Sequence, residues 1–186
     1  MNCKNGSIII LSGPSGAGKN TVYDELVKMS DSIAQTISAT TRSPRDNEKD
    51  GVDYYFVSVE RFEELINEGA LIEYVKYGNN YYGTLKSEIA RLTADGKTVI
   101  LVIEVNGAAN IKKAIPESTS VFIVPPSIEE LRRRIVSRGQ NTESEVETRI
   151  AIAVEEMKYK DSYDYCVVND TLENCVNDIF KIINSI

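Results

Sequence analysis

The 186-residue sequence contains no histidine. This absence excludes imidazole acid–base catalysis, serine or cysteine nucleophiles that a histidine activates, and most catalytic zinc sites. Any catalysis by this chain must therefore depend on positioning and electrostatics.

Cysteines and long apolar runs are also scarce. The three cysteines, Cys3, Cys166 and Cys175, fit neither a disulfide framework nor a close metal-ligand spacing. Cys166 lies in the apolar run 165–168, so we expect reduced cysteines that serve packing. Apolar runs end at about seven residues, far short of a membrane span, and residues 1–6 carry no signal-peptide pattern. We therefore expect a cytoplasmic protein that does not contact a membrane.

Basic residues are outnumbered by acidic ones. The chain has 21 lysines and arginines against 28 aspartates and glutamates, a formal net charge of −7. Such a surface repels polyanions, so we expect no nucleic-acid partner, whereas a small anionic ligand in a local basic cleft is compatible with it. With 42% hydrophobic residues, the chain is long enough for one well-buried core with small attached subdomains.

What the sequence does contain is a phosphate-binding loop. A glycine-rich segment that ends in Lys19 follows the apolar run 8–11 and precedes the helix-compatible stretch 21–29. Its glycines let backbone N–H groups point at phosphate oxygens, the helix adds its positive dipole end, and Lys19 supplies a charge for the β and γ phosphates. The residues expected to bind ATP here are Gly13, Pro14, Ser15, Gly16, Ala17, Gly18, Lys19, Asn20 and Thr21.

The loop departs from the usual pattern at one position. A serine or threonine normally follows the lysine and binds Mg²⁺, but Asn20 stands there and the hydroxyl appears only at Thr21. An amide oxygen is a neutral and poorer ligand for this metal. We therefore expect Mg²⁺ to enter with ATP, and the motif assigns it no protein ligand.

Strand-like and helix-like segments alternate along most of the chain. Four apolar runs, 8–11, 99–105, 121–124 and 165–168, have the continuous pattern of parallel strands that are covered on both faces. Helices are expected between them, at 21–29, about 107–115, 128–138, roughly 144–159 and 172–186. Residues 127–130 and 142–145 match capping boxes. The pattern predicts an α/β, three-layer P-loop fold with a parallel core sheet.

Residues 36–86 break this alternation. They contain short β-like pieces that are rich in tyrosine, and one apolar helix face that ends at Gly69. The residues of that face are Val59, Phe62, Leu65 and Ile66. We therefore expect 36–86 to be an inserted mixed β/α subdomain between two parts of a core, 1–35 and 87–186. A polar break after residue 137 marks a small lid of about 138–150.

A second anion site is indicated by the run 38–45, followed by Tyr54 and the run 80–84. Two arginines three residues apart, beside hydroxyls, suit a phosphate monoester because guanidinium forks bind its oxygens in pairs. The alternative is a solvated basic loop. At these motifs the chain resembles guanylate kinases, which transfer a phosphate from ATP to GMP. The resemblance extends from Ile8 to about Ile183.

The resemblance implies the acceptor-site residues. It assigns the GMP phosphate to Ser38, Arg42, Arg45, Tyr54 and Tyr82, and the guanine to Glu73, Thr84 and Glu104. Guanine offers N1–H and an N2 amine, which carboxylates accept, and an O6 acceptor, which a hydroxyl can satisfy. The alternatives are core packing for each tyrosine and a solvent-facing strand position for Glu73. The implied subdomain role of residues 36–86 is GMP binding.

The resemblance also implies catalytic residues. Lys19 would be joined by the lid arginines Arg134, Arg138 and Arg149, which neutralise the transferring phosphoryl and exclude water on closure. One or two of these arginines could instead be solvated helix residues. Asn169 matches the segment near the ATP adenine.

The chain departs from the family at the end of its second core strand. The family pattern acid-x-acid-x-Gln-Gly occurs as residues 102–107, with Val102 in place of the first acid and Asn106 in place of glutamine. That first acid is expected near Mg²⁺ in phosphate-loop enzymes, so both usual metal contacts are weakened together.

Of the three functions that the sequence leaves open, we expect the first. The first is a guanylate kinase with small-molecule substrates ATP and GMP, dGMP use and oligomeric state being undetermined. The second is a non-catalytic guanylate-kinase-like binding module for phosphopeptides, which Asn20 and Val102 would suit but the intact Lys19 argues against. The third is a kinase for another small phosphorylated acceptor, which Glu73, Thr84 and Glu104 argue against.

Overall fold

The computed structural model describes residues 6–137 and 142–186. Its core is a five-stranded parallel sheet in the order β2-β7-β1-β8-β9. The strands are β1 (Ile8–Ser12), β2 (Ile33–Gln35), β7 (Thr98–Val102), β8 (Thr119–Val124) and β9 (Tyr165–Val168). The predicted α/β fold with a parallel core sheet is therefore confirmed.

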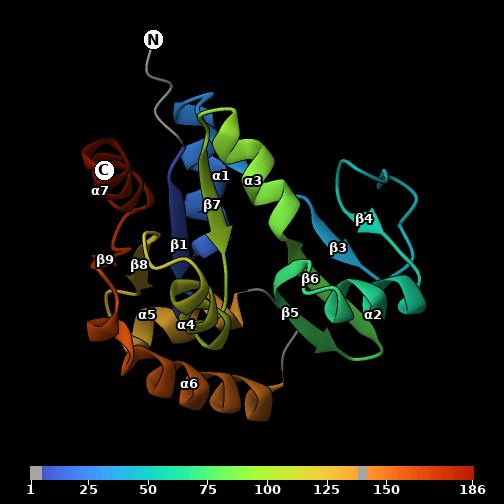
Figure 1. Ribbon diagram of the computed structural model, residues 1–186. Helices are drawn as coiled ribbons and strands as arrows, with labels where there is room; N and C mark the ends of the chain where they lie inside the picture. Colours follow the sequence, from blue (N-terminus) through green and yellow to red (C-terminus); the bar gives the residue numbers. More distant parts are fainter. Residues whose placement is uncertain (1–5, 138–141) are drawn as a thin grey trace.

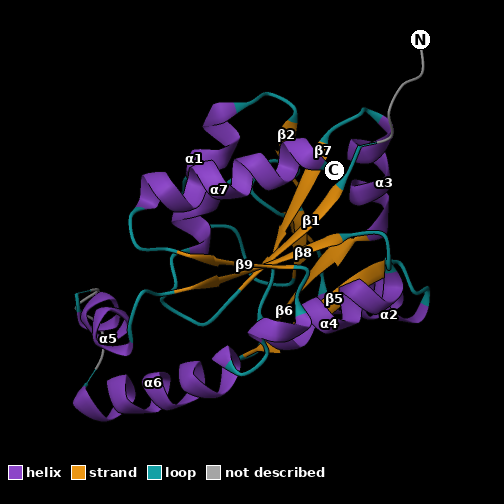
Figure 2. Cartoon of the chain, turned by 90° about the vertical axis from the view of Figure 1, so that its left-hand side faces the viewer, coloured by secondary structure: helices purple, strands orange, loops and turns teal. Residues whose placement is uncertain are grey.

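Helices cover both faces of this sheet (Figures 1 and 2). Strand β1 sends Ile9 and Leu11 to one face and Ile10 to the other, so each face has its own apolar cluster. On the first face pack α1 (Lys19–Met29) and α7 (Leu172–Ser185), and on the second α3 (Lys86–Ala94) and α4 (Val105–Ala114). Three layers result, as the alternation predicted.

A second, mixed sheet lies beside the core, in the order β4-β3-β6-β5 (Figure 1). Its elements are β3 (Ser38–Thr40), β4 (Tyr55–Phe56), α2 (Val59–Asn67), β5 (Leu71–Tyr77) and β6 (Asn80–Leu85). The fully buried Phe62 of α2 anchors a small apolar cluster against this sheet. Helix α2 begins at the Ser58 cap. Gly69 follows its end at φ +63°, as the sequence predicted.

Two further helices, α5 (Ile128–Val136) and α6 (Glu143–Met157), pack on each other at the carboxyl end of the sheet (Figure 1). The capping box at Thr142 and Glu145 is confirmed. The one expected at Ser127 is only half formed, because Ser127 accepts the Glu130 N–H while the Glu130 carboxylate turns to Arg133 and Arg134. Only the short 3₁₀ turn η1 (Lys160–Ser162) separates α6 from β9.

Other expectations need correction. Strand β9 is an edge strand with Tyr165 and Val168 exposed, so it is not covered on both faces, and Cys166 is exposed too. Cys175 is buried as expected, and burial raises the pKa of its thiol to about 12. Cys3 lies outside the described residues.

The apolar run 99–105 was expected to be one strand. Its strand ends at Val102, and helix α4 begins at Val105. The structure also contains β2 and α3, which the sequence pattern did not reveal.

Within the described ranges, no helix is both long enough and apolar enough to cross a lipid bilayer.

Candidate active site

The glycine-rich loop connects β1, the middle strand of the core sheet, to α1. Gly18 caps α1 in the left-handed region, at φ +94°, where an added Cβ would lie 2.5 Å from the Asn169 side-chain nitrogen. Gly13 has φ +144°, and a Cβ there would lie 2.3 Å from the Ile123 carbonyl oxygen. Only glycine satisfies both the backbone conformation and the available space at these positions.

Lys19 is 8% exposed and points back at the loop. Its Nζ donates to the carbonyl oxygens of Gly13 at 2.6 Å and Pro14 at 3.3 Å, and lies 3.5 Å from Glu104 Oε2. The charge is thus held at the mouth of the loop, where a phosphate would meet it together with the N-terminus of α1.

Asn169 follows β9 and lies beneath the loop, only 5% exposed. Its side-chain amide donates to the Ala17 carbonyl oxygen at 2.8 Å, and its backbone N–H donates to the Val124 oxygen at 2.8 Å. The sequence pointed to this residue as a neighbour of the adenine. Its observed contacts are those of a support for the phosphate-binding loop.

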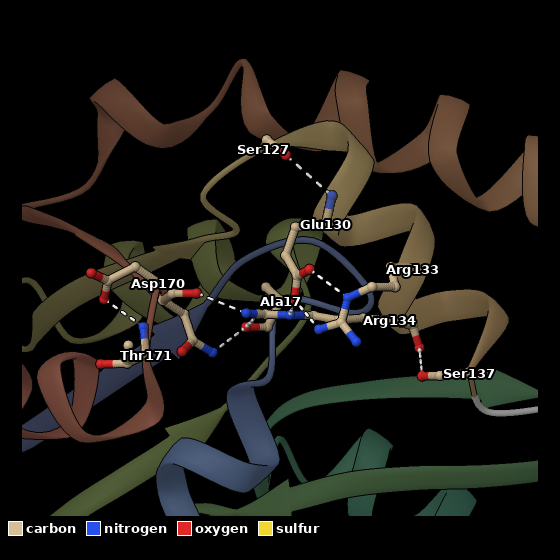
Figure 3. Close-up of polar contacts among 9 residues, drawn as sticks. Ala17, Ser127, Glu130, Arg133, Arg134, Ser137, Asp170 and Thr171 are labelled. Atoms are coloured by element: carbon tan, nitrogen blue, oxygen red, sulfur yellow. Dashed lines mark hydrogen bonds and ion pairs between the residues drawn. The ribbon is translucent and has the colours of Figure 1, made fainter.

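Arg134 of α5 contacts the same two residues, Ala17 and Asn169 (Figure 3). Its NH2 donates to the Asn169 carbonyl oxygen at 2.9 Å, its NH1 is 3.5 Å from the Ala17 oxygen, and its Nε donates to Glu130 at 2.8 Å. The guanidinium groups of Arg133 and Arg134 hold the pKa of Glu130 at about 2. Arg134 therefore contacts the loop through backbone carbonyls.

The other two arginines that the resemblance assigns to the lid are Arg149 and Arg138. Arg149 of α6 donates from NH2 to the Ser15 hydroxyl at 2.9 Å, so it reaches the loop. Arg138 lies outside the described residues. Arg132 forms ion pairs with Glu143 and Glu147 of α6.

A cleft of about 860 Å³ opens between the ends of β2 and β7 and the inserted sheet. Six of the eight residues that the resemblance assigns to GMP line it: Ser38, Tyr54, Glu73, Tyr82, Thr84 and Glu104. The Thr84 hydroxyl donates to Glu73 Oε1 at 2.8 Å, and burial raises the pKa of Glu73. Glu104 faces both this cleft and Lys19, so the loop and the cleft adjoin.

The remaining two, Arg42 and Arg45, follow β3 at the Tyr54 side of the cleft. The Arg42 guanidinium carbon lies 5.4 Å from the centre of the Tyr54 ring. The Arg45 guanidinium is exposed and donates no hydrogen bond to any residue that the structure describes.

The sequence connected three positions with Mg²⁺, namely Asn20, Thr21 and Val102. Asn20 and Thr21 are exposed in the first turn of α1, and Val102 forms part of the cleft wall. Across residues 6–137 and 142–186, no three His, Cys, Asp or Glu side chains are grouped closely enough to hold a metal ion.

Three carboxylates near the site were not anticipated. Glu48 binds Arg42, Glu130 binds Arg134, and Glu156 of α6 has a pKa raised by burial and, second, by the charge of Glu104. The i,i+4 spacing of 130 and 134 is a sequence signal for the contact between Glu130 and Arg134.

Comparisons with known proteins agree with this geometry. A family model described as guanylate kinase matches residues 5–186. A guanylate kinase of Clostridioides difficile (strain 630) is 46% identical over 185 residues, which cover 100% of this chain and 90% of that protein. One of Clostridium acetobutylicum is 43% identical, covering 97% of this chain and 86% of that protein. The crystal structure of guanylate kinase from Anaplasma phagocytophilum is 33% identical and superposes with a TM-score of 0.73, covering 98% of this chain and 86% of that one.

The fit of Gly18 above Asn169 can be tested by matched substitutions. We expect Gly18→Ala to lower the free energy of unfolding by more than Gly69→Ala does. Both replace a glycine of positive φ, which costs roughly 1–2 kcal/mol, but nothing lies within 4 Å of a Cβ at Gly69. Urea unfolding of the two variants measures the difference, and equal losses would show that Asn169 does not constrain position 18.

Proposed function

The chain belongs to the guanylate kinase family, and we propose that its cleft transfers the γ-phosphate of ATP to GMP, giving ADP and GDP. The observation that carries the proposal is the position of Glu104. Its carboxylate lies 3.5 Å from Lys19 on the loop side and lines the cleft with Glu73 on the other. A donor phosphate on the loop and an acceptor in the cleft would therefore meet at one place.

The donor side is assigned to the loop and the first turn of α1. ATP phosphates would replace the Gly13 and Pro14 carbonyl oxygens as partners of Lys19, while the N–H groups of the loop and helix receive the phosphate oxygens. The full set is Gly13, Pro14, Ser15, Gly16, Ala17, Gly18, Lys19, Asn20 and Thr21, with Asn169 as its support.

The acceptor side is assigned to the inserted subdomain, residues 36–86. Ser38, Arg42, Arg45, Tyr54 and Tyr82 would bind the GMP phosphate, and Glu73, Thr84 and Glu104 the guanine. The Thr84 hydroxyl already donates to Glu73, which fixes this carboxylate and leaves its other lone pairs for the base. Guanine presents two donors there, whereas adenine lacks the N2 amine.

The transfer itself needs no covalent intermediate and no strong base, because the acceptor phosphate is already an anion. Lys19, Arg134, Arg138 and Arg149 are assigned to charge neutralisation, and the two sites to alignment. Arg149 reaches Ser15 of the loop, and Arg134 touches the carbonyl oxygens of Ala17 and Asn169.

Mg²⁺ is the expected cofactor, and the residues present can accommodate it. Asn20 and Thr21 are exposed at the start of α1, next to Lys19, and this ion usually keeps several waters and needs few protein ligands. When bound with ATP, Mg²⁺ would supply positive charge that neutralises the charge developing on the phosphates.

Replacing the loop lysine tests the donor site. We expect Lys19→Ala to lower kcat with GMP by about 100-fold or more while the chain stays folded, because a charge is lost at the phosphates. ADP release is measured with GMP, AMP and UMP as acceptors. Lys28→Ala, an exposed lysine on the same helix, is the matched control and should retain its rate. A parent chain without activity toward any acceptor would favour a non-catalytic binding module.

Replacing Glu73 tests base recognition. We expect Glu73→Gln to reduce the preference for GMP over AMP in kcat/KM by about tenfold or more, since an amide nitrogen would face a donor of the base. Glu63→Gln, on the exposed side of α2, is the control. An unchanged preference in the Glu73 variant would place base recognition elsewhere.

Restoring the missing acid tests the metal surroundings. We expect Val102→Asp to lower the Mg²⁺ concentration for half-maximal rate, because position 102 lies in the cleft wall and an aspartate there supplies a carboxylate. Val102→Asn introduces a side chain of the same shape as aspartate but without the charge, and should leave the Mg²⁺ requirement unchanged. Coincident Mg²⁺ titrations of the Asp variant and the parent, both folded, would show that position 102 is not near the metal.

A further inference from the structure

Arg42, assigned above to the GMP phosphate, is already bound by a carboxylate. Its NH1 and NH2 donate to Oε2 and Oε1 of Glu48, both at 2.8 Å, and NH1 also donates to the Ser43 carbonyl oxygen at 2.8 Å. The two side chains are only 18% and 17% exposed. This is a bidentate pair largely shielded from water, the strongest kind of arginine contact.

Glu48 is itself held in place by the backbone. The Arg45 N–H donates to Glu48 Oε2 at 2.8 Å, and the Glu48 N–H donates to the Arg45 carbonyl oxygen at 2.9 Å, which closes the turn 45–48. Arg42, and next the Arg45 amide, hold the pKa of Glu48 at about 2, so the carboxylate remains ionised throughout the neutral range.

Aromatic rings fix the plane of the Arg42 guanidinium. Its central carbon lies 5.4 Å from the centre of the Tyr54 ring and 5.7 Å from that of Phe56. The Tyr54 ring in turn meets Tyr82 edge-on, with the ring centres 6.2 Å apart. Tyr54 and Tyr82 line the cleft, so the group is oriented beside the acceptor site.

Glu48 and Ser43 do not use all the N–H donors of Arg42. A guanidinium has five N–H donors. Glu48 takes one on NH1 and one on NH2, and Ser43 takes the second on NH1. The Tyr82 side chain is a further, weaker partner of the guanidinium. The two donors that Glu48 and Ser43 leave, on Nε and NH2, share one edge of the fork, and such an edge can bind two phosphate oxygens at once.

We propose that Glu48 is a positioning residue for the acceptor: by occupying the end of the Arg42 fork, it presents the Nε edge to the GMP phosphate. The proposal rests on the proposed function. The opposite possibility is that Glu48 competes with the phosphate for Arg42 and must be displaced. The donor count argues against competition, because carboxylate and phosphate use different edges.

The two possibilities predict opposite changes in the affinity for GMP when the Glu48 charge is removed. By charge alone, removing a carboxylate near an anion site strengthens anion binding. If Glu48 positions Arg42, then Glu48→Gln weakens binding of GMP, by about tenfold or more in Kd, because the amide cannot accept both N–H groups. Calorimetric titration of the full chain with GMP, without ATP, measures this directly. A Kd for GMP that is unchanged or tighter overturns the proposal.

Two comparisons separate positioning from general damage. Asp46→Asn removes the same charge from an exposed position in the same turn, and should change the Kd for GMP by less than about twofold. Guanosine, which lacks the phosphate, should bind parent and Glu48→Gln equally, whereas a loss of guanosine binding would mean that the cleft itself is disrupted and would overturn the proposal. Glu48→Asp keeps the charge and should restore part of the affinity.

A double-mutant cycle tests whether Glu48 acts through Arg42. In an Arg42→Ala background, adding Glu48→Gln should change the Kd for GMP by less than about twofold. A full additive loss would assign Glu48 some other role and overturn the proposal. A parent chain that does not bind GMP would instead contradict the proposed function, so the two failures are distinguishable.

Discussion

The site depends on one hydrogen bond, from the Asn169 side-chain amide to the carbonyl oxygen of Ala17. It ties the phosphate-binding loop to the end of β9, on the far side of β8 from β1. Because Asn169 is nearly fully buried, leaving its amide or the Ala17 carbonyl unpaired would cost more than an exposed contact contributes. Arg134 binds the backbone of the same two residues, so α5 is placed by this contact too.

A second constraint joins the inserted subdomain to the core. Glu88 of α3 is 4% exposed and accepts from the Tyr55 hydroxyl at 3.0 Å, from Arg91 at 3.1 Å, and from the Ile37 N–H at 3.4 Å. Arg91 is the principal cause of its lowered pKa. A buried carboxylate with three donors around it is stable only while those donors stay in place. The start of β3, and with it Ser38, is thereby fixed relative to the core helix.

The sequence predicts the parts of this protein that are local in the chain. The loop, its lysine and the helix that follows are separated by fixed spacings, and the long apolar runs identify four of the five core strands. The three-residue β2 carries too little pattern, and an apolar run does not distinguish a central strand from the exposed edge strand β9. Side-chain pairs formed only by folding, such as Asn169 with Ala17, cannot be recognised without the structure.

The same limit applies to the acceptor site. The resemblance assigned Arg42 to the GMP phosphate, but only the structure shows that Glu48 already binds two of its five donors. Arg42 and Glu48 lie six residues apart in irregular chain, where no helical or strand period predicts contact. Glu104 was expected at the end of a strand, and its position at the start of α4 explains how it faces both the loop and the cleft.

The position of Glu88 has a mechanical consequence. The inserted subdomain is joined to the core by two chain crossings, before β3 and after β6, and Glu88 binds Ile37 at the first and lies three residues beyond Leu85 at the second. Any rigid rotation of the subdomain must therefore turn about an axis through these crossings. Displacement in such a rotation would be smallest near these crossings. The hydrogen bond from the Tyr55 hydroxyl to Glu88 would oppose it, since this bond joins the inserted sheet to the core helix.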